Sequence, residues 1–173
     1  MAAEQSATSL ATQSADTQTG GQSNAAPTTG MGTMRAAIVS LGGEQFTIDL
    51  QNVREVFVVE SITPVPGMPA GLVGVTNLRG SVVPLLDLRQ MIGLAAENPL
   101  KYAVVVKHGN WQVGVLVDTV PEIRTLSKDQ FLPAPVGMGD GGNPFVSTVV
   151  NLQDRLRGVL ETSVVLSHFE GTG

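Results

Sequence analysis

Residues 71–88 read GLVGVTNLRGSVVPLLDL and carry the strongest structural signal in the chain. Two apolar segments, 72–78 and 82–88, flank Arg-Gly-Ser, and Gly80 stands where a tight turn needs a positive φ. The pattern predicts a β-hairpin. Because Pro84 has no backbone N–H, we expect the second strand to lie at a sheet edge, or Pro84 to sit where no ladder donor is needed.

Similar short strands are expected on both sides of this hairpin, because apolar runs recur between Gly, Asn and Asp turns. They fall at residues 36–41, 44–50, 102–106, 113–117, 120–126, 145–150 and 156–160. Residues 53–59 have mixed spacing, which indicates a short helical turn running into a strand. Further helical turns are expected at 88–92, closed by Gly93, from Ser127, which begins a capping box, and at 163–169.

Short strands without a long amphipathic helix predict an all-β fold. Four or five strands fall on each side of about residue 90, which fits two small five-stranded barrels sharing a hydrophobic core, with short helical turns. Residues 1–33 are mostly Ala, Ser, Thr, Gln and Gly, and we expect a disordered tail, either a tether or an unselected leader. The folded domain is expected at 34–170.

The bulk composition argues against several classes of protein. A net charge of −5 and 4% aromatic residues suit neither phosphate binding nor base stacking, so no nucleic-acid partner is expected. The absence of cysteine excludes disulfides and thiolate metal sites. The sequence shows no signal peptide and no apolar run of about 18 residues, so we expect a cytoplasmic protein with no direct membrane insertion.

Motifs for catalysis are also missing from the sequence. Neither His-Glu-x-x-His nor Gly-x-Ser-x-Gly occurs, and the glycine-rich stretch 137–142 lacks the Lys-Ser/Thr of a phosphate loop, so it is expected to be a mobile loop. His108 and His168 are far apart in sequence and are expected on the surface. Asp118 and Asp129 have no spacing that brings them together. We therefore predict a non-enzymatic protein with no catalytic residues, metal or cofactor.

Arg79 is the residue in the central hairpin that is best suited to recognition. It is one of few cations in the folded part, and it lies between two apolar strands. Its guanidinium offers five N–H donors in a rigid fork that can hold a carboxylate. The hairpin is therefore predicted to act through protein contacts.

Residues 74–89, GVTNLRGSVVPLLDLR, strongly resemble the signature hairpin of the CheW family. The upstream segments LGGEQFTIDLQNVREV and ITPVPGMP also match, as do VGVLVDTV and LPAP in the second half. The resemblance covers about residues 35–169, which is almost all of the predicted fold. It implies two five-stranded SH3-like barrels packed around a common core.

The resemblance also implies a function and a set of contact residues. Proteins of this family bridge the cytoplasmic tips of chemoreceptors, the methyl-accepting chemotaxis proteins, to the regulatory domain of the histidine kinase CheA. Arg79 matches the family's hairpin arginine and Glu55 its strand glutamate, which in the family lie near the receptor-facing surface and can pair. Val53, Asn77 and Leu78 occupy neighbouring motif positions. A Glu55–Arg79 pair can brace the hairpin or set the contact geometry, and the sequence does not choose.

Two readings remain beside bacterial chemotaxis: a CheW-like coupler of a pilus-motility or other chemosensory pathway, and a small nucleic-acid-binding barrel, which composition opposes. The chain departs from the family pattern at residues 145–151, FVSTVVN, where a glycine-rich motif is usual. The final helix is also expected to be short.

Overall fold

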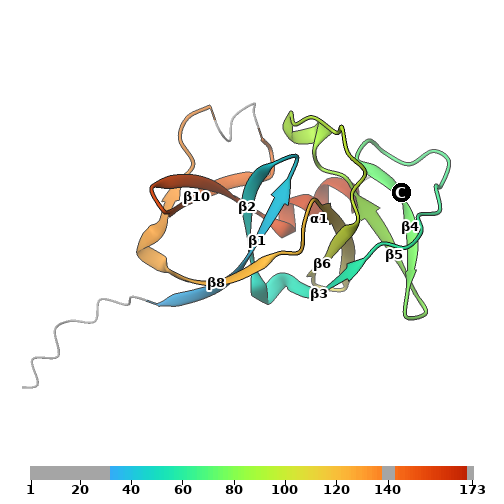
Figure 1. The fold of residues 1–173 in the computed structure, drawn as a ribbon, viewed down its shortest axis with the longest axis horizontal. Coiled ribbons are helices and arrows are strands. Elements are labelled where there is room, and N and C mark those ends of the chain that lie inside the picture. Colours follow the sequence, from blue (N-terminus) through green and yellow to red (C-terminus); the bar gives the residue numbers. More distant parts are fainter. Residues whose placement is uncertain (1–31, 138–142, 171–173) are drawn as a thin grey trace, which may run out of the picture. The chain divides into compact units, whose positions relative to one another are not determined.

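The computed structural model describes residues 32–137 and 143–170, which form two curled β-sheets (Figure 1). Sheet A has the strand order β8-β1-β2-β11-β10-β9, and sheet B has the order β3-β6-β7-β5-β4. The strands of sheet A are β1 (Thr33–Leu41), β2 (Glu44–Asp49), β8 (Glu122–Ser127), β9 (Phe131–Pro133), β10 (Val146–Leu152) and β11 (Arg155–Leu160). Those of sheet B are β3 (Val53–Val58), β4 (Leu72–Leu78), β5 (Ser81–Leu86), β6 (Tyr102–His108) and β7 (Trp111–Val117).

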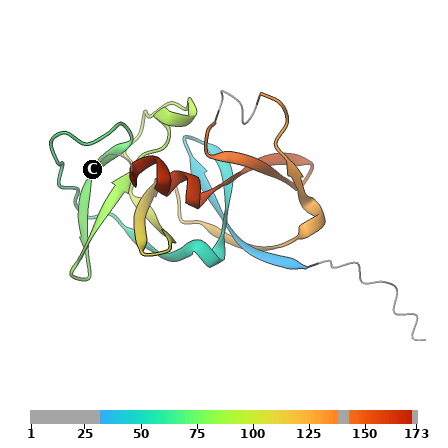
Figure 2. The ribbon, with the colours of Figure 1, turned by 180° about the vertical axis from the view of Figure 1, so that it is seen from behind.

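Four short helices complete the described fold. Three are single 3-10 turns: η1 (Leu50–Asn52), η2 (Gln90–Ile92) and η3 (Lys128–Gln130). The helix α1 (Thr162–Glu170) lies across one face of sheet B and packs on β6 and β7 (Figure 2). The turn closed by Gly93 and the capping box at Ser127 are both confirmed. No helix in residues 32–137 and 143–170 is long and apolar enough to cross a bilayer.

The all-β class with two small barrels is confirmed, but a division of the strands near residue 90 is wrong. Sheet B is built from one continuous segment, whereas sheet A joins β1 and β2 to strands from the other end of the described chain. The joint is the parallel pair β2–β11, in which Thr47 lies opposite Val159. Hairpins leave a local signal in the sequence, but a parallel pair between distant strands leaves none.

The two sheets repeat one pairing scheme. In sheet B the hairpin β6–β7 joins the hairpin β4–β5 through a parallel pair of β7 with β5, and β3 flanks β6. In sheet A the hairpin β1–β2 joins β10–β11 through the parallel pair of β2 with β11, and β8 flanks β1. Sheet A is therefore a circularly permuted version of sheet B, with its last two strands supplied by the start of the domain.

Apolar side chains form three clusters, which explains why β1 and β6 are apolar on both faces. One cluster lies inside sheet A around Ala36, Ile38 and Val150, and a smaller one lies inside sheet B around Leu85 and Ala103. The largest lies between the sheets. It contains buried residues from β1, β2, β6, β7, β10, β11 and α1, including Val39, Phe46, Val104, Val115, Phe145 and Val165. Each barrel thus buries one face that it could not cover alone.

The segment at 53–59 differs from the expectation of a helical turn running into a strand. The helical turn is η1, which ends before this segment, and residues 53–58 are strand throughout. The register of β3 on β6 shifts between Val53 and Glu55, which marks a β-bulge. An extra residue at the bulge breaks the alternation of the strand and produces the mixed spacing. The three-residue strand β9 was not expected, since its last residue is a proline.

Pro84 does not lie on an edge strand, because β5 has β4 on one side and β7 on the other. Instead, Pro84 sits where the ladder needs no N–H donor, which was the alternative expectation. Val75, opposite Pro84, exchanges both its backbone hydrogen bonds with Thr63 on the far side of β4. The backbone N–H and C=O of Val75 are therefore both paired without a donor from Pro84. On the other side, the pairing of β5 with β7 begins only at Leu85.

One carboxylate connects the two sheets directly. Asp118 follows β7, and its Oδ2 accepts a hydrogen bond from Ser40 Oγ at 2.9 Å. Its two oxygens also accept from the backbone N–H groups of Gly42 at 3.1 Å and Gly43 at 2.8 Å. The β1–β2 turn of sheet A is thus held by the end of a strand of sheet B. The sequence offered no sign of this role.

Two expected features lie wholly or mostly outside the described residues. Residues 1–31 of the expected tail are not described, and β1 already begins at Thr33. Residues 138–142 of the glycine-rich stretch are also not described.

Candidate protein-binding site

A small hollow of about 130 Å³ opens at one end of sheet B. All five strands of the sheet or their turns contribute to it, so it is the open end of the barrel. It is lined by Arg54, Glu55, Leu78, Arg79, Ser81, Val83, Val105 and Gln112. The tips of the β4–β5 and β6–β7 hairpins lie at this same end (Figure 2). Three of the five residues named from the sequence, Glu55, Leu78 and Arg79, meet here.

The bulge in β3 decides which side chains reach the hollow. Val53 pairs with Val106 and packs against the core between the sheets, whereas Glu55 pairs with Val105 and lines the barrel opening. In a regular strand, residues two apart share one face. The bulge places Val53 and Glu55 on opposite faces, so they do not form one contact surface, contrary to what their spacing suggests.

The β4–β5 turn positions Arg79. Arg79 and Gly80 both have positive φ, at 52° and 86°, as a type I′ turn requires. The Oδ1 atom of Asn77 accepts a hydrogen bond from the Gly80 N–H at 2.8 Å. Asn77 therefore stabilises the turn from within the hairpin, and its amide group is at least partly occupied there.

Arg79 and Glu55 form an ion pair across the opening, with Nη2 of Arg79 3.3 Å from Oε2 of Glu55. The side chain of Arg79 is 82% exposed and that of Glu55 is 22% exposed. Although this distance defines an ion pair, the groups are not aligned for a hydrogen bond, and buried Oε2 accepts none from any described residue. The pair therefore keeps unused donors on Arg79 and an unused acceptor on Glu55.

Arg54 and Gln112 also line the opening, and the sequence analysis did not predict them as site residues. Nη1 of Arg54 donates a hydrogen bond to Oε1 of Gln112 at 2.7 Å, which ties β3 to β7 beside the opening. Neither residue lies in the hairpin motif, and they are far apart in sequence. The mixed spacing of residues 53–59 was the local sign in the sequence that this part of β3 is unusual.

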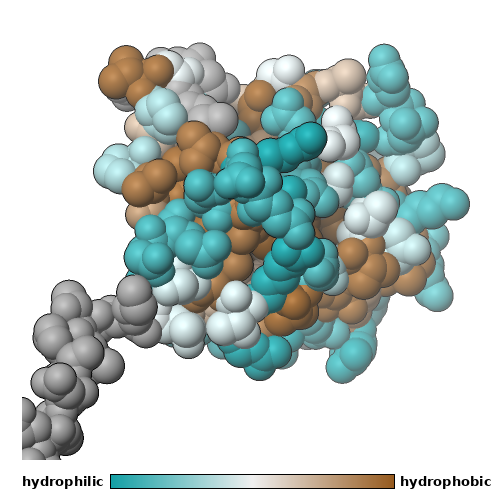
Figure 3. Space-filling model, turned by 60° about the vertical axis from the view of Figure 1, so that its left-hand side comes forward, coloured by the Kyte–Doolittle hydropathy of each residue, from teal (hydrophilic) through white to brown (hydrophobic). Residues whose placement is uncertain are grey.

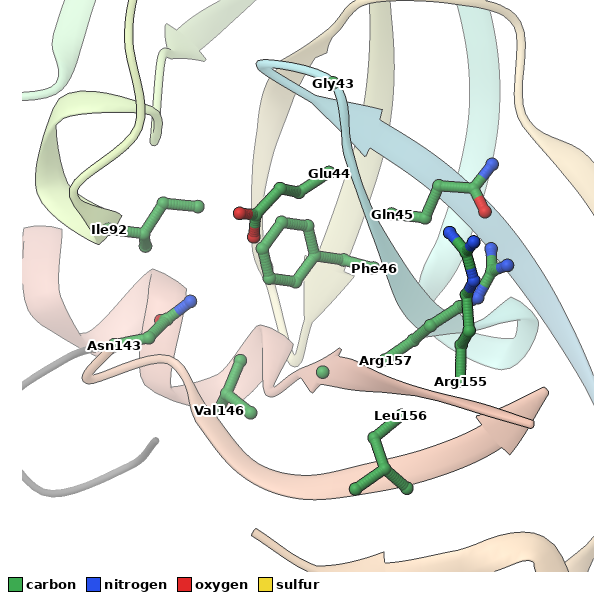
Figure 4. Close-up of a pocket in the computed structure, with 11 residues that line it drawn as sticks. Gly43, Glu44, Gln45, Phe46, Ile92, Asn143, Val146, Arg155, Leu156 and Arg157 are labelled. Carbon is green, nitrogen blue, oxygen red and sulfur yellow. The ribbon is translucent and has the colours of Figure 1, made fainter. Parts of the chain in front are cut away.

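A second hollow, of about 380 Å³, is lined by residues of β2, β10 and β11 and their turns (Figure 4). In this view, Arg155 and Arg157 extend from β11 toward Gln45, and Glu44 points toward Ile92. Its described lining contains no His, Ser, Thr, Tyr or Lys, and Glu44 is the one carboxylate in it. We find no assembled catalytic group in this hollow.

The described surface and the two histidines show no further site. In the view of Figure 3, which brings the side of sheet A forward, apolar side chains lie in small groups separated by hydrophilic ones. His108 and His168 are exposed, as expected, although the ring of His168 contacts those of Phe145 and Phe169 edge-on. Among the described residues, no group of three or more His, Asp or Glu is arranged to hold a metal ion.

The ion pair between Arg89 and Asp87 is buried and has a structural role. Nε and Nη2 of Arg89 donate to the two Asp87 oxygens at 3.0 and 2.7 Å, and Nη1 donates to the Asn98 carbonyl at 2.7 Å. The hydrogen bonds to Asp87 raise the pKa of Arg89 above its ordinary value. Its charge is therefore fixed, and it anchors the loop before β6.

Two permuted barrels around one core, with a charged opening on sheet B, form an all-β module whose polar opening is suited to contacts with another protein. A family model described as the CheW-like domain matches residues 35–170. This chain therefore belongs to the CheW-like family, whose members act in chemotaxis as coupling proteins.

Individual relatives agree with this assignment. The chain is 32% identical over 127 residues to a chemotaxis protein CheW of Rhizobium meliloti, covering 72% of this chain and 82% of that protein. It is 34% identical over 112 residues to protein FrzA of Myxococcus xanthus, covering 64% of this chain and 69% of that one. The crystal structure of scaffolding protein TtCheW from Thermoanaerobacter tengcongensis matches with a TM-score of 0.67 and 25% identity, over 75% of this chain and 89% of that structure.

Proposed function

We propose that this chain is a non-enzymatic adaptor that couples the cytoplasmic tips of chemoreceptors to the regulatory domain of the histidine kinase CheA. The observation that carries the proposal is the incomplete ion pair of Glu55 and Arg79 at the open end of sheet B. Such a pair contributes only about 0–1 kcal/mol to stability when exposed. The unused donors of Arg79, whose side chain is 82% exposed, are better explained by a partner that accepts hydrogen bonds from them.

The five residues named from the sequence take different parts in this proposal. Glu55 and Arg79 contact the receptor directly, and Leu78 supplies apolar area beside them. Asn77 acts by holding the turn that presents Arg79. Val53 acts from the core side of β3, where it supports the bulge. The adaptor works in the cytoplasm, with residues 34–170 as its coupling domain.

The test is co-sedimentation of the purified chain with a receptor signalling fragment and the CheA regulatory domain. We expect a ternary complex, and stimulation of autophosphorylation when the full kinase is used. Arg79→Glu should weaken sedimentation with the receptor fragment by about ten-fold, because reversing a contact charge removes an attraction and adds a repulsion. Absence of binding to both partners would rule out the coupling role.

A matched control is available on sheet A. Arg124 pairs with Glu122 at 2.9 Å on β8, and both side chains are solvent-accessible. Arg124→Glu makes the same charge change away from the proposed site. Equal losses for Arg79→Glu and Arg124→Glu would show a general charge effect and would argue against a specific contact.

A further inference from the structure

Trp111 is the only tryptophan in the chain, and its side chain is 61% exposed. It begins β7 at the tip of the β6–β7 hairpin, directly opposite His108. Large exposed aromatic side chains are uncommon on a monomer surface, and tryptophan is the residue most enriched at energetically important interface positions. A packing role on the rim of the barrel would leave less of the ring exposed.

The face of sheet B that carries Trp111 is identified by the alternation of β7. Val113, Val115 and Val117 belong to the core between the sheets, and Trp111 has the same parity. Trp111 therefore lies on the same face of sheet B as α1, at the end of β7 that α1 does not cover. Gln112, with the opposite parity, lines the barrel opening instead.

Val82 extends this apolar surface onto β5. Its side chain is 66% exposed, and it has the same parity as Leu86, which lies in the core between the sheets. The parallel register of β5 on β7 sets Leu85 opposite Gly114 and Leu86 opposite Val115. Val82 lies four residues from Leu86 toward the β4–β5 tip, and Trp111 lies four residues from Val115 toward the β6–β7 tip. Two exposed apolar side chains thus stand on neighbouring strands at the end that presents Arg79.

Charged groups at this end are mostly cationic. Arg54 and Arg79 line the opening, and Lys107 lies opposite Gln112 near the hairpin tip. Glu55 is the one carboxylate among the described residues that line the opening, and Arg79 pairs with it. In a chain with a net charge of −5, this local excess of cations favours an acidic partner.

We propose that Trp111 and Val82 form an apolar anchor beside the Glu55–Arg79 pair, which receives a receptor-tip surface carrying an apolar side chain next to carboxylates. This inference rests on the proposed function and extends its site from one hairpin to two. Arg79 takes a carboxylate, while the indole ring and Val82 bury an apolar side chain. The anchor contributes most of the affinity, and the cations set the orientation.

The single tryptophan provides a direct test in the intact chain. A receptor fragment without tryptophan is titrated into the protein while co-sedimentation, emission wavelength and acrylamide quenching are followed. We expect the emission to move to shorter wavelength and quenching to fall as the complex forms. Trp111→Ala should weaken binding about ten-fold, whereas Trp111→Phe should retain most of it. Leu156→Ala, at a 45% exposed residue of β11, is the control, and its effect should stay within about two-fold.

The possible outcomes separate the two proposals. If the receptor fragment sediments with the chain but emission, quenching and the Trp111→Ala affinity are unchanged, the anchor is wrong and the coupling role stands. If only the kinase regulatory domain alters the emission, the assignment to the receptor is wrong. If neither partner sediments, the coupling role fails and the anchor fails with it. Matching urea midpoints for wild type and Trp111→Ala would show that lost binding does not come from lost folding.

Discussion

Arg79 occupies a left-handed backbone conformation, with a φ of 52°, that costs a residue with a Cβ atom about 1 kcal/mol relative to glycine. The turn could form with Asn or Gly at this position and lose nothing in its backbone geometry. The ion pair of the guanidinium with Glu55 adds little to the free energy of unfolding, because the Arg79 side chain is largely exposed. The placement is therefore easier to explain by recognition than by folding.

A charge swap tests whether the two residues act as a pair. Glu55→Arg and Arg79→Glu should each weaken receptor binding about ten-fold, and the double variant should recover part of the loss if the pair is presented as a unit. Affinity is measured by the same sedimentation assay for all three variants. Additive losses in the double variant would mean that Glu55 and Arg79 contact the partner independently.

Stability distinguishes this account from a bracing role for the pair. Because Arg79 is exposed, its replacement should change the free energy of unfolding by no more than about 1 kcal/mol. A larger drop in urea-induced unfolding, in parallel with the loss of binding, would favour the hairpin brace that the sequence left open.

At the scale of single elements, the sequence predicted the hairpins well because their signals are local. The Gly80 turn, the Gly93 helix end and the Ser127 capping box each depend on residues within a few positions of one another. The bulge in β3 could not be predicted, because it exists only relative to the partner strand β6. For the same reason, the opposite faces of Val53 and Glu55 could not be predicted from the sequence.

The β1–β2 turn yields a prediction at the scale of elements. Asp118→Ala removes the acceptor of three hydrogen bonds that join this turn to the end of β7. Hydrogen bonds to a charged group contribute about 1.5–3 kcal/mol, and the exposed geometry of two of them places the expected loss near about 2 kcal/mol. Urea unfolding measures it.

Asp118→Asn is the control for that prediction. The amide keeps one acceptor oxygen for the Gly42 and Gly43 backbone groups, so it should retain part of the stability. If alanine is no more destabilising than asparagine, the turn does not depend on these hydrogen bonds.

At the scale of the molecule, the core between the sheets makes each barrel dependent on the other. Val104, Val106 and Val115 of sheet B are buried only because sheet A and α1 cover them. A fragment of residues 50–119 contains all of sheet B but exposes this face. We expect it to show no cooperative thermal transition by circular dichroism, while a chain beginning at residue 32 unfolds in one step. A sharp transition in the fragment would show that sheet B is stable alone.

The sequence predicted two small barrels but not which strands belong to each, and sheet A has six strands where five were expected. Short apolar runs with turns between them indicate barrels, and a common core is the usual solution for two that are each too small. The parallel pair of Thr47 with Val159 has no local signature, so a division at residue 90 was the simplest count. The same limit hides that Val82 and Trp111 lie on neighbouring strands, because β5 and β7 pair in parallel and are distant in sequence.

The permuted connectivity has a consequence for how the protein is made. On the ribosome, β1 and β2 emerge first, but β11, which completes their sheet, emerges last. Translation of the segment from Thr47 to Val159 takes on the order of 10 s. During this interval, the strands of sheet B can pair with one another, while the first hairpin lacks β8 until residues 122–127 emerge and lacks β11 until the end. The newborn hairpin is therefore the part of the chain with the longest exposure to chaperones, and barrel A closes only when the final strands are released.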